Sequence, residues 1–273
     1  MSKYIYIDKE VNILTGQEAQ EAVEKEGDEK FLREDRGIDR VPIGRWGIAQ
    51  AYERKSWMEK HLSARDDRNY DHFLRFDRYK VLNGLSFNHA IELGCGPFTN
   101  LRLIARSCRI RRCTLLDPLV EEYLKHPNCS YNKKFLYSHR SLFLRNFRRI
   151  PIEQIIPMPI EEMPTDTQFD FVVIINVLEH CYDISKIFEK IISVMKENAY
   201  IVFHDKYYDH AKIAENAKKV YDAGHPLRVD RKVIDDFLNA KFVTVFKKDS
   251  RVEYWFEGED FSYDAFYFVG KLL

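Results

Sequence analysis

Four ionisable side chains lie in three short segments of the sequence where they could carry acid–base chemistry. His180 lies in the segment "VLEHCYD", His204 and Asp205 lie in "VFHDKYYDH", and His225 lies in "GHPLR". An imidazole changes its charge near neutral pH, so histidine is the natural general base. We therefore treat these four residues as candidate catalytic groups.

Each of these segments also has a structural interpretation. If a helix begins after the apolar run, Asn176, Glu179 and His180 fall on one helical face, or Glu179 and His180 only order a loop. The segment around His204 is either a substrate loop or a solvated loop. Gly and Pro flank His225, which favours a turn.

A second chemical pattern is the stretch "AIELGCGPFTN", residues 90–100. Gly94 and Gly96 allow a sharp turn and a close approach of backbone to a ligand. The following helix offers free N–H groups. A dinucleotide site needs a third glycine where this chain has Thr99, so nicotinamide binding is disfavoured. The alternative is an ordinary strand–turn–helix.

Glu92 precedes the glycine pair by two residues, and "LLDP" places Asp117 about 20 residues further on. These two motifs resemble those of the class I S-adenosylmethionine-dependent methyltransferases, over roughly residues 85–273. The resemblance implies S-adenosylmethionine as cofactor, with a carboxylate that accepts the ribose hydroxyls. It also implies an α/β Rossmann-like methyltransferase fold: a mostly parallel seven-stranded sheet with an antiparallel last strand.

The resemblance assigns further cofactor contacts. The adenine-contacting acid of the family falls on Pro159 here, so the Ile160 backbone and Glu161 take its place. Quinone-ring O-methyltransferases carry a similar E-x-x-E-H pattern that has been linked to a divalent metal, but this chain has Asn176 at the first acid, so we expect no metal. The full cofactor-binding set comprises Glu92, Gly94, Cys95, Gly96, Asp117, Pro118, Ile160, Glu161 and Asn176.

The elements that must position these residues alternate between strand and helix patterns. Such alternation favours a parallel sheet covered by helices on both faces. The last two strands have no helix between them and could pair antiparallel. The predicted strands are 89–94, 112–117, one near 152, 169–176, 199–205, 241–248 and 264–273, and the helices are 100–108, 185–198 and 231–240.

Residues 1–85 read as an N-terminal helical cap or lid, and residues 86–273 as the methyltransferase domain. Within the cap, 16–37 is a helix or a partly ordered arm, and helices are expected over 44–62 and 68–85. Trp46, Tyr52 and Trp57 are candidates to line a substrate pocket, although an aromatic stripe is more often core.

Composition excludes several classes of protein. The 273 residues contain 43 Lys+Arg and 43 Asp+Glu, so no net field draws the chain to nucleic acid or to a membrane. No apolar run approaches the ~18 residues of a spanning helix, and we expect a cytoplasmic protein. Five cysteines without a C-x-x-C pair indicate reduced, buried thiols.

A basic insert near 128–150 interleaves arginines and lysines with aromatic residues. It could hold phosphates or RNA, but an amphipathic helix with packed aromatics is the favoured interpretation. We expect methylation of a small molecule such as a sugar, O- ahead of N-methylation, by in-line displacement, and a homodimer is an option. The alternatives are an RNA or protein methyltransferase and a non-catalytic scaffold.

Overall fold

The computed structural model describes residues 5–7, 13–15, 40–64, 67–139, 147–208, 224–256 and 259–273. Its centre is an eight-stranded sheet in the order β11-β12-β10-β9-β4-β6-β8-β7. The five strands from β8 to β10 are parallel neighbours. They are β4 (Ala90–Leu93), β6 (Cys113–Leu116), β8 (Phe147–Ile156), β9 (Phe169–Ile175) and β10 (Met195–Tyr207).

The last strands close the sheet as expected. β12 (Glu259–Leu272) lies between β10 and β11 (Phe242–Phe256) and pairs antiparallel with both. The predicted strand 241–248 is longer in the structure because β11 extends as a hairpin partner of β12. The Rossmann-like α/β fold with an antiparallel last strand is therefore confirmed.

The basic insert differs from the prediction. Instead of an amphipathic helix, it contributes β7 (Phe135–His139), an eighth strand that pairs antiparallel with β8. Leu136 and its cross-strand partner Ile150 are buried, so period-two burial rather than a helical face organises the described part of this segment. Residues 140–146 lie outside the described residues.

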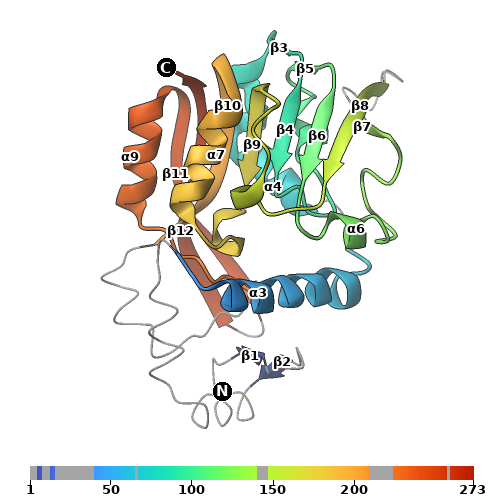
Figure 1. The fold of residues 1–273 in the computed structure, drawn as a ribbon, viewed down its shortest axis with the longest axis vertical. Coiled ribbons are helices and arrows are strands. Elements are labelled where there is room, and N and C mark those ends of the chain that lie inside the picture. The colour runs from blue at the N-terminus through green and yellow to red at the C-terminus, as the bar shows by residue number, and fades with distance from the viewer. Residues whose placement is uncertain are drawn as a thin grey trace.

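Helices cover both faces of the sheet (Figure 1). On one face lie α7 (Ile184–Val194) and α9 (Arg231–Lys241), whose apolar residues recur at helical spacing. On the other face the core includes residues of α4 (Asp67–Arg75), α5 (Leu101–Ile104) and α6 (Val120–Tyr123). The predicted helix 185–198 is shorter because β10 begins directly after Val194.

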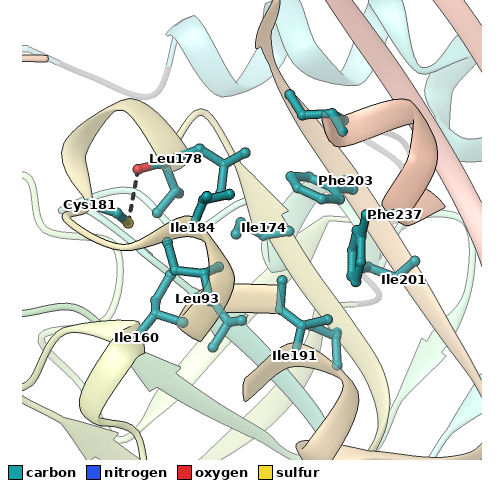
Figure 2. Packing of buried hydrophobic residues seen from close by; sticks show 14 of the residues in the cluster. Leu93, Ile160, Ile174, Leu178, Cys181, Ile184, Ile191, Ile201, Phe203 and Phe237 are labelled. Atoms are coloured by element: carbon teal, nitrogen blue, oxygen red, sulfur yellow. Dashed lines mark hydrogen bonds between the residues drawn. The ribbon is translucent and has the colours of Figure 1, made fainter. Parts of the chain in front are cut away.

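Side chains alternate between the two cores along each strand. Val172 and Ile174 of β9 join the core beneath α7, whereas Phe171 and Val173 join the opposite one. All four are completely buried, which explains why β9 is apolar at nearly every position. Figure 2 shows the first core, where strand residues such as Leu93, Ile174 and Phe203 pack with Ile184 and Ile191 of α7 and Phe237 of α9.

The N-terminal part contains helices and a small hairpin. β1 (Ile5–Ile7) pairs with β2 (Ile13–Thr15), and α3 (Ile43–Lys55) continues into the π-helical turn η1 (Ser56–Lys60). In Figure 1, α3 runs along the lower end of the sheet. The helix expected over 44–62 is thus confirmed, and the segment 16–37 lies outside the described residues.

The second predicted helix, 68–85, ends early. α4 stops at Arg75, and a 3-10 segment, η2 (Asp77–Leu82), follows a kink where Asp77, Arg78 and Tyr79 have positive φ. The kink buries Tyr79 completely and stacks its ring on Phe76. The remaining short elements are β3 (Ser86–Phe87), β5 (Arg109–Ile110), η3 (Ile160–Glu162) and η4 (Leu178–His180).

The cysteine prediction is also confirmed. Cys95, Cys108, Cys113, Cys129 and Cys181 are all buried and carry free thiols. Among the described residues, no helix combines the length and the apolar character that a membrane span requires.

Candidate functional site

The glycine loop joins β4 to α5 and uses its two glycines differently. Gly94 has φ +70°, and a Cβ there would lie 2.5 Å from the Val177 side chain. Gly96 has φ +52°, but a Cβ there would have no heavy atom within 4 Å. Gly94 therefore permits close packing against the neighbouring turn, whereas Gly96 borders open space.

Glu92 lies beneath this loop and holds it. Its buried carboxylate accepts hydrogen bonds from the Thr99 hydroxyl, from the Asn100 side chain and from the backbone N–H groups of Asn100 and Leu101. Burial outweighs these bonds and raises the pKa of Glu92 to about 7. The carboxylate that sequence reasoning assigned to the cofactor is thus engaged in positioning the loop and capping α5.

Asp117 directly follows β6 and lies beside Gly96. Its Oδ2 accepts the Gly96 N–H at 3.0 Å, and its Oδ1 accepts the Leu119 N–H at 2.8 Å. Each oxygen keeps a second lone pair for another donor. Burial raises the pKa of Asp117 to about 6. The carboxylate therefore stands next to the open space at Gly96.

Two neighbours in the predicted cofactor set pack around this loop. Cys95 is buried, and its thiol lies 3.7 Å from the Tyr131 hydroxyl, which in turn donates to the Gly96 carbonyl oxygen at 2.7 Å. Pro118 is half-buried between Asp117 and α6. Cys95 contributes packing rather than a side chain directed at a ligand.

Ile160 and Glu161 form part of η3. The Ile160 side chain belongs to the core beneath α7. Glu161 Oε1 accepts the N–H groups of Tyr182 and Asp183 at 2.7 and 3.1 Å, and burial raises the pKa of this carboxyl. Its Oε2 is buried without a hydrogen-bond partner among the described residues. Glu161 therefore fixes η3 to the segment that follows η4.

The turn after β9 is held by Asp205. Asn176 has φ +58°, an uncommon conformation for a residue with a side chain. Asp205 Oδ2 accepts the Val177 and Leu178 N–H groups at 2.9 and 2.6 Å. Burial and the Glu179 charge raise the pKa of Asp205 to about 7. Asp205 is thus buried under the turn as a positioning residue.

His204 is not brought together with the other predicted catalytic residues. It is completely buried and faces the α4 side of the sheet, with its ring stacked on Tyr267 at 4.2 Å and beside His72 at 4.5 Å. Its Nδ1 donates to the Phe266 carbonyl oxygen at 2.7 Å. Burial lowers its pKa well below the ordinary value. These contacts are those of a core histidine.

His180 and His225 do meet, around Glu179. Glu179 is 1% exposed and binds the Lys206 ammonium through both carboxylate oxygens, at 2.6 and 2.7 Å. The Tyr208 hydroxyl donates to it at 2.8 Å. His225 Nε2 lies 3.4 Å and His180 Nε2 4.0 Å from Glu179 Oε1. We call these five residues the Glu179 cluster.

The electrostatics of the cluster favour one charge state. Burial alone would raise the pKa of Glu179, but the charges of His225, Lys206 and His180 outweigh it and lower the pKa to about 2. Burial lowers the pKa of His180. The lowered pKa of His180 favours its neutral imidazole, which is the protonation state of a general base, and in that state the Lys206 ammonium is the positive charge that remains bound to Glu179.

Sequence reasoning missed Glu53, Lys206 and Tyr208. Glu53 Oε1 lies 3.5 Å from His180 Nδ1, although the two residues are far apart in the chain. A signal existed for Lys206, since it continues the polar segment that includes Asp205. Trp46, predicted to line a pocket, donates its indole N–H to the His180 carbonyl oxygen at 3.0 Å.

Proteins of known structure share this fold. NodS, an N-methyltransferase of Bradyrhizobium japonicum solved with S-adenosyl-L-homocysteine, aligns at TM-score 0.50 and 16% identity over 81% of this chain and 98% of its own. The protein solved with the Haloferax volcanii Trm112 methyltransferase activator aligns at TM-score 0.54 and 13% identity, over 80% of this chain and 96% of its own. YcgJ of Bacillus subtilis aligns at TM-score 0.50 and 11% identity, over 74% of this chain and 98% of its own. At these identities the likeness concerns the fold.

Sequence comparison identifies the family. Among curated protein sequences no significant match is found. A family model described as a methyltransferase domain matches residues 63–243, which is more than half of the 273 residues. The chain therefore belongs to the methyltransferase-domain family and is a class I S-adenosylmethionine-dependent methyltransferase.

Proposed function

We propose that this enzyme methylates an oxygen atom of a small molecule, and that His180 and His225 assist the loss of the acceptor's proton. The observation that carries the proposal is the Glu179 cluster, which gathers two imidazoles around a buried carboxylate. These side chains follow β9 and β10, and ligands of open α/β sheets bind at the carboxyl ends of the strands. Asp117 directly follows β6, a strand of the same sheet.

The residues of the glycine loop fit the cofactor. Asp117 presents its remaining lone pairs beside Gly96, where a Cβ would meet no protein atom within 4 Å. When bound, S-adenosylmethionine supplies an activated methyl group, which passes to the acceptor and leaves a thioether. Asp117 would accept the ribose hydroxyls, and the Gly94–Gly96 backbone would lie against the methionine part.

The chain's own groups then act on the acceptor. An imidazole without charge can assist proton loss from a hydroxyl, and Glu179 stabilises the positive charge that this creates. Lys206 and Tyr208 hold Glu179 in place, and Asp205 fixes the turn that carries it. We also propose Ile160 and Glu161 as neighbours of the cofactor's adenine ring.

Other acceptors define the alternatives. NodS is named an N-methyltransferase, so transfer to nitrogen is the second candidate reaction. From the sequence we also propose that the acceptor is a sugar, that the enzyme forms a homodimer and that it is located in the cytoplasm. The molar mass in solution tests the dimer.

Calorimetric titration with S-adenosylhomocysteine tests the cofactor site. We expect micromolar binding by the wild type and at least tenfold weaker binding by Asp117→Ala, because the two hydroxyl acceptors are lost. Asp166→Ala is the matched control, since Asp166 is exposed. Equal affinities in all three proteins would overturn the assignment of Asp117.

The catalytic proposal needs an acceptor, found by screening hydroxylated and amino metabolites for methyl transfer. We expect His225→Asn and His180→Asn each to lower kcat at least tenfold while the affinity for S-adenosylhomocysteine is kept. Unchanged kcat in both variants would show that the histidines take no part in proton loss.

A further inference from the structure

We propose that Glu53, His180 and His225 form a binding site for a divalent transition-metal ion of the zinc class. Each residue offers one ligand atom, and the three atoms lie within 4.8 Å of one another. They come from α3, from η4 and from the segment before α9. Glu53 lies outside the motif at residues 176–180, from which the sequence predicts no metal.

The helix α3 is built to face His180. Trp46, Gln50 and Glu53 recur at helical spacing and all reach this residue. The Trp46 indole and the Gln50 amide each donate to the His180 carbonyl oxygen at 3.0 Å. Glu53 Oε1 lies 3.5 Å from His180 Nδ1. Three contacts from one helical face hold the carboxylate beside the imidazole.

The third ligand is held by packing. The Tyr52 ring lies against Gly224, where a Cβ would come within 2.9 Å of it. The His180 and His225 rings are 4.7 Å apart between centroids. Only a glycine at 224 allows α3 to approach this segment so closely. The approach places His225 within reach of the same ion as Glu53.

The separation of the His180 and Glu53 ligand atoms suits a small cation. His180 Nδ1 lies 3.5 Å from Glu53 Oε1 and 3.1 Å from the Gly224 carbonyl oxygen. Ligands bound at ~2.0–2.2 Å stand roughly 3.0–3.5 Å apart in tetrahedral or octahedral geometry. Without metal, a proton on Nδ1 is donated to the Gly224 carbonyl oxygen. Two imidazoles and one carboxylate are a donor set that favours zinc over calcium or magnesium.

The charges around the site also suit a divalent cation. The Glu179 carboxylate is already matched by the Lys206 ammonium, which binds both of its oxygens. Glu53 then supplies the negative charge that faces the ion, and its side chain is 18% exposed, against 20% for His180 and 24% for His225. The site is therefore partly shielded from water but open to an entering ion and to a further ligand.

A metal ion at this site would determine how the histidines assist the reaction. This role of the ion rests on the proposed function. A divalent ion lowers the pKa of a hydroxyl group that it coordinates. With the ion bound, His180 and His225 would assist proton loss through the ion, as its ligands, instead of taking the proton themselves, and the acceptor's proton would leave to solvent. The ion would also tie α3 to the catalytic end of the sheet.

Metal titration of the full chain tests the site. After chelator treatment, the protein is dialysed against Zn²⁺ and, separately, Co²⁺, and bound metal is counted by mass spectrometry. We expect one ion per chain and a Co²⁺ visible spectrum of protein-ligated metal. Glu53→Gln, which keeps the size of the side chain, and His225→Asn should each weaken binding at least tenfold. Glu59→Gln is the control because Glu59 is exposed on the adjoining turn.

Each outcome decides one claim. Wild-type binding no tighter than millimolar, or equal affinity in Glu53→Gln and Glu59→Gln, overturns the metal site. Circular dichroism of the variants excludes loss of the fold as the cause. S-adenosylhomocysteine titration of the same samples separates this proposal from the function: cofactor binding without metal binding rejects only the ion, and the reverse result rejects only the cofactor assignment.

Discussion

At the residue scale, the two loop glycines differ in what a side chain would meet. In Gly94→Ala, the new Cβ is strained by the positive φ and also collides with the Val177 side chain. In Gly96→Ala, only the strain of the positive φ applies. We expect a loss of unfolding free energy of about 2–4 kcal/mol for Gly94→Ala and about 1 kcal/mol for Gly96→Ala. Urea unfolding of both variants measures the difference.

The same pair should separate stability from binding. Gly96→Ala places a methyl group in the space proposed for the cofactor, so its affinity for S-adenosylhomocysteine should fall at least tenfold despite its small loss of stability. A Gly96→Ala variant with wild-type affinity would contradict the placement of the cofactor at this glycine. Gly84→Ala is the control for positive φ in open space away from the loop.

At the element scale, the ion pair of Glu179 and Lys206 joins η4 to β10. Glu179 is 1% and Lys206 17% exposed, so removal of one partner leaves a largely buried charge. We expect Glu179→Gln to lower the unfolding free energy by about 3 kcal/mol, and Glu179→Gln/Lys206→Met to recover much of that loss. Urea unfolding at pH 7 provides this double-mutant comparison.

This pair also predicts a pH dependence. The folded-state pKa of Glu179 is lowered from 4.5 to about 2, so the stabilisation is complete above pH 4.5 and is lost as pH falls toward 2. The wild type should therefore progressively lose its advantage over the double variant as pH falls from 4.5 toward 2. A constant difference across this range would show that the pair does not titrate as stated.

At the scale of the whole molecule, charge balance bears on the class of acceptor. The chain has equal numbers of acidic and basic residues, 43 of each. In the β7–β8 hairpin, Arg149 lies over the rings of Phe135 and Tyr137. These aromatic faces are thus occupied by the protein's own guanidinium, which reduces their use as stacking surfaces for bases.

We therefore expect no RNA binding beyond the non-specific range of about 10⁻⁴–10⁻⁶ M at physiological salt. Filter binding of a mixed RNA pool at two salt concentrations measures this. Submicromolar affinity that falls steeply with salt, and that is reduced in Lys133→Ala/Lys134→Ala, would instead support the macromolecular acceptor. Both lysines are exposed, so the variant should keep its fold.

The sequence by itself determined the alternation of strands and helices and the two cofactor motifs. Those signals are local: β9 is apolar because both of its faces are buried, and positive φ at Gly94 and Gly96 favours residues without a Cβ. The helix predicted for the basic insert was wrong because interleaved aromatic and basic residues fit a helix or a hairpin equally well. Cross-strand pairing with β8 selects the hairpin.

Only the tertiary structure decided which polar residues meet. His204 and Asp205 are neighbours in sequence, but successive strand residues point to opposite faces, so one enters the core and the other holds the turn after β9. Glu53 is more than a hundred residues from His180 and reaches it because α3 packs across the end of the sheet. Such contacts depend on chain topology, which no local pattern encodes.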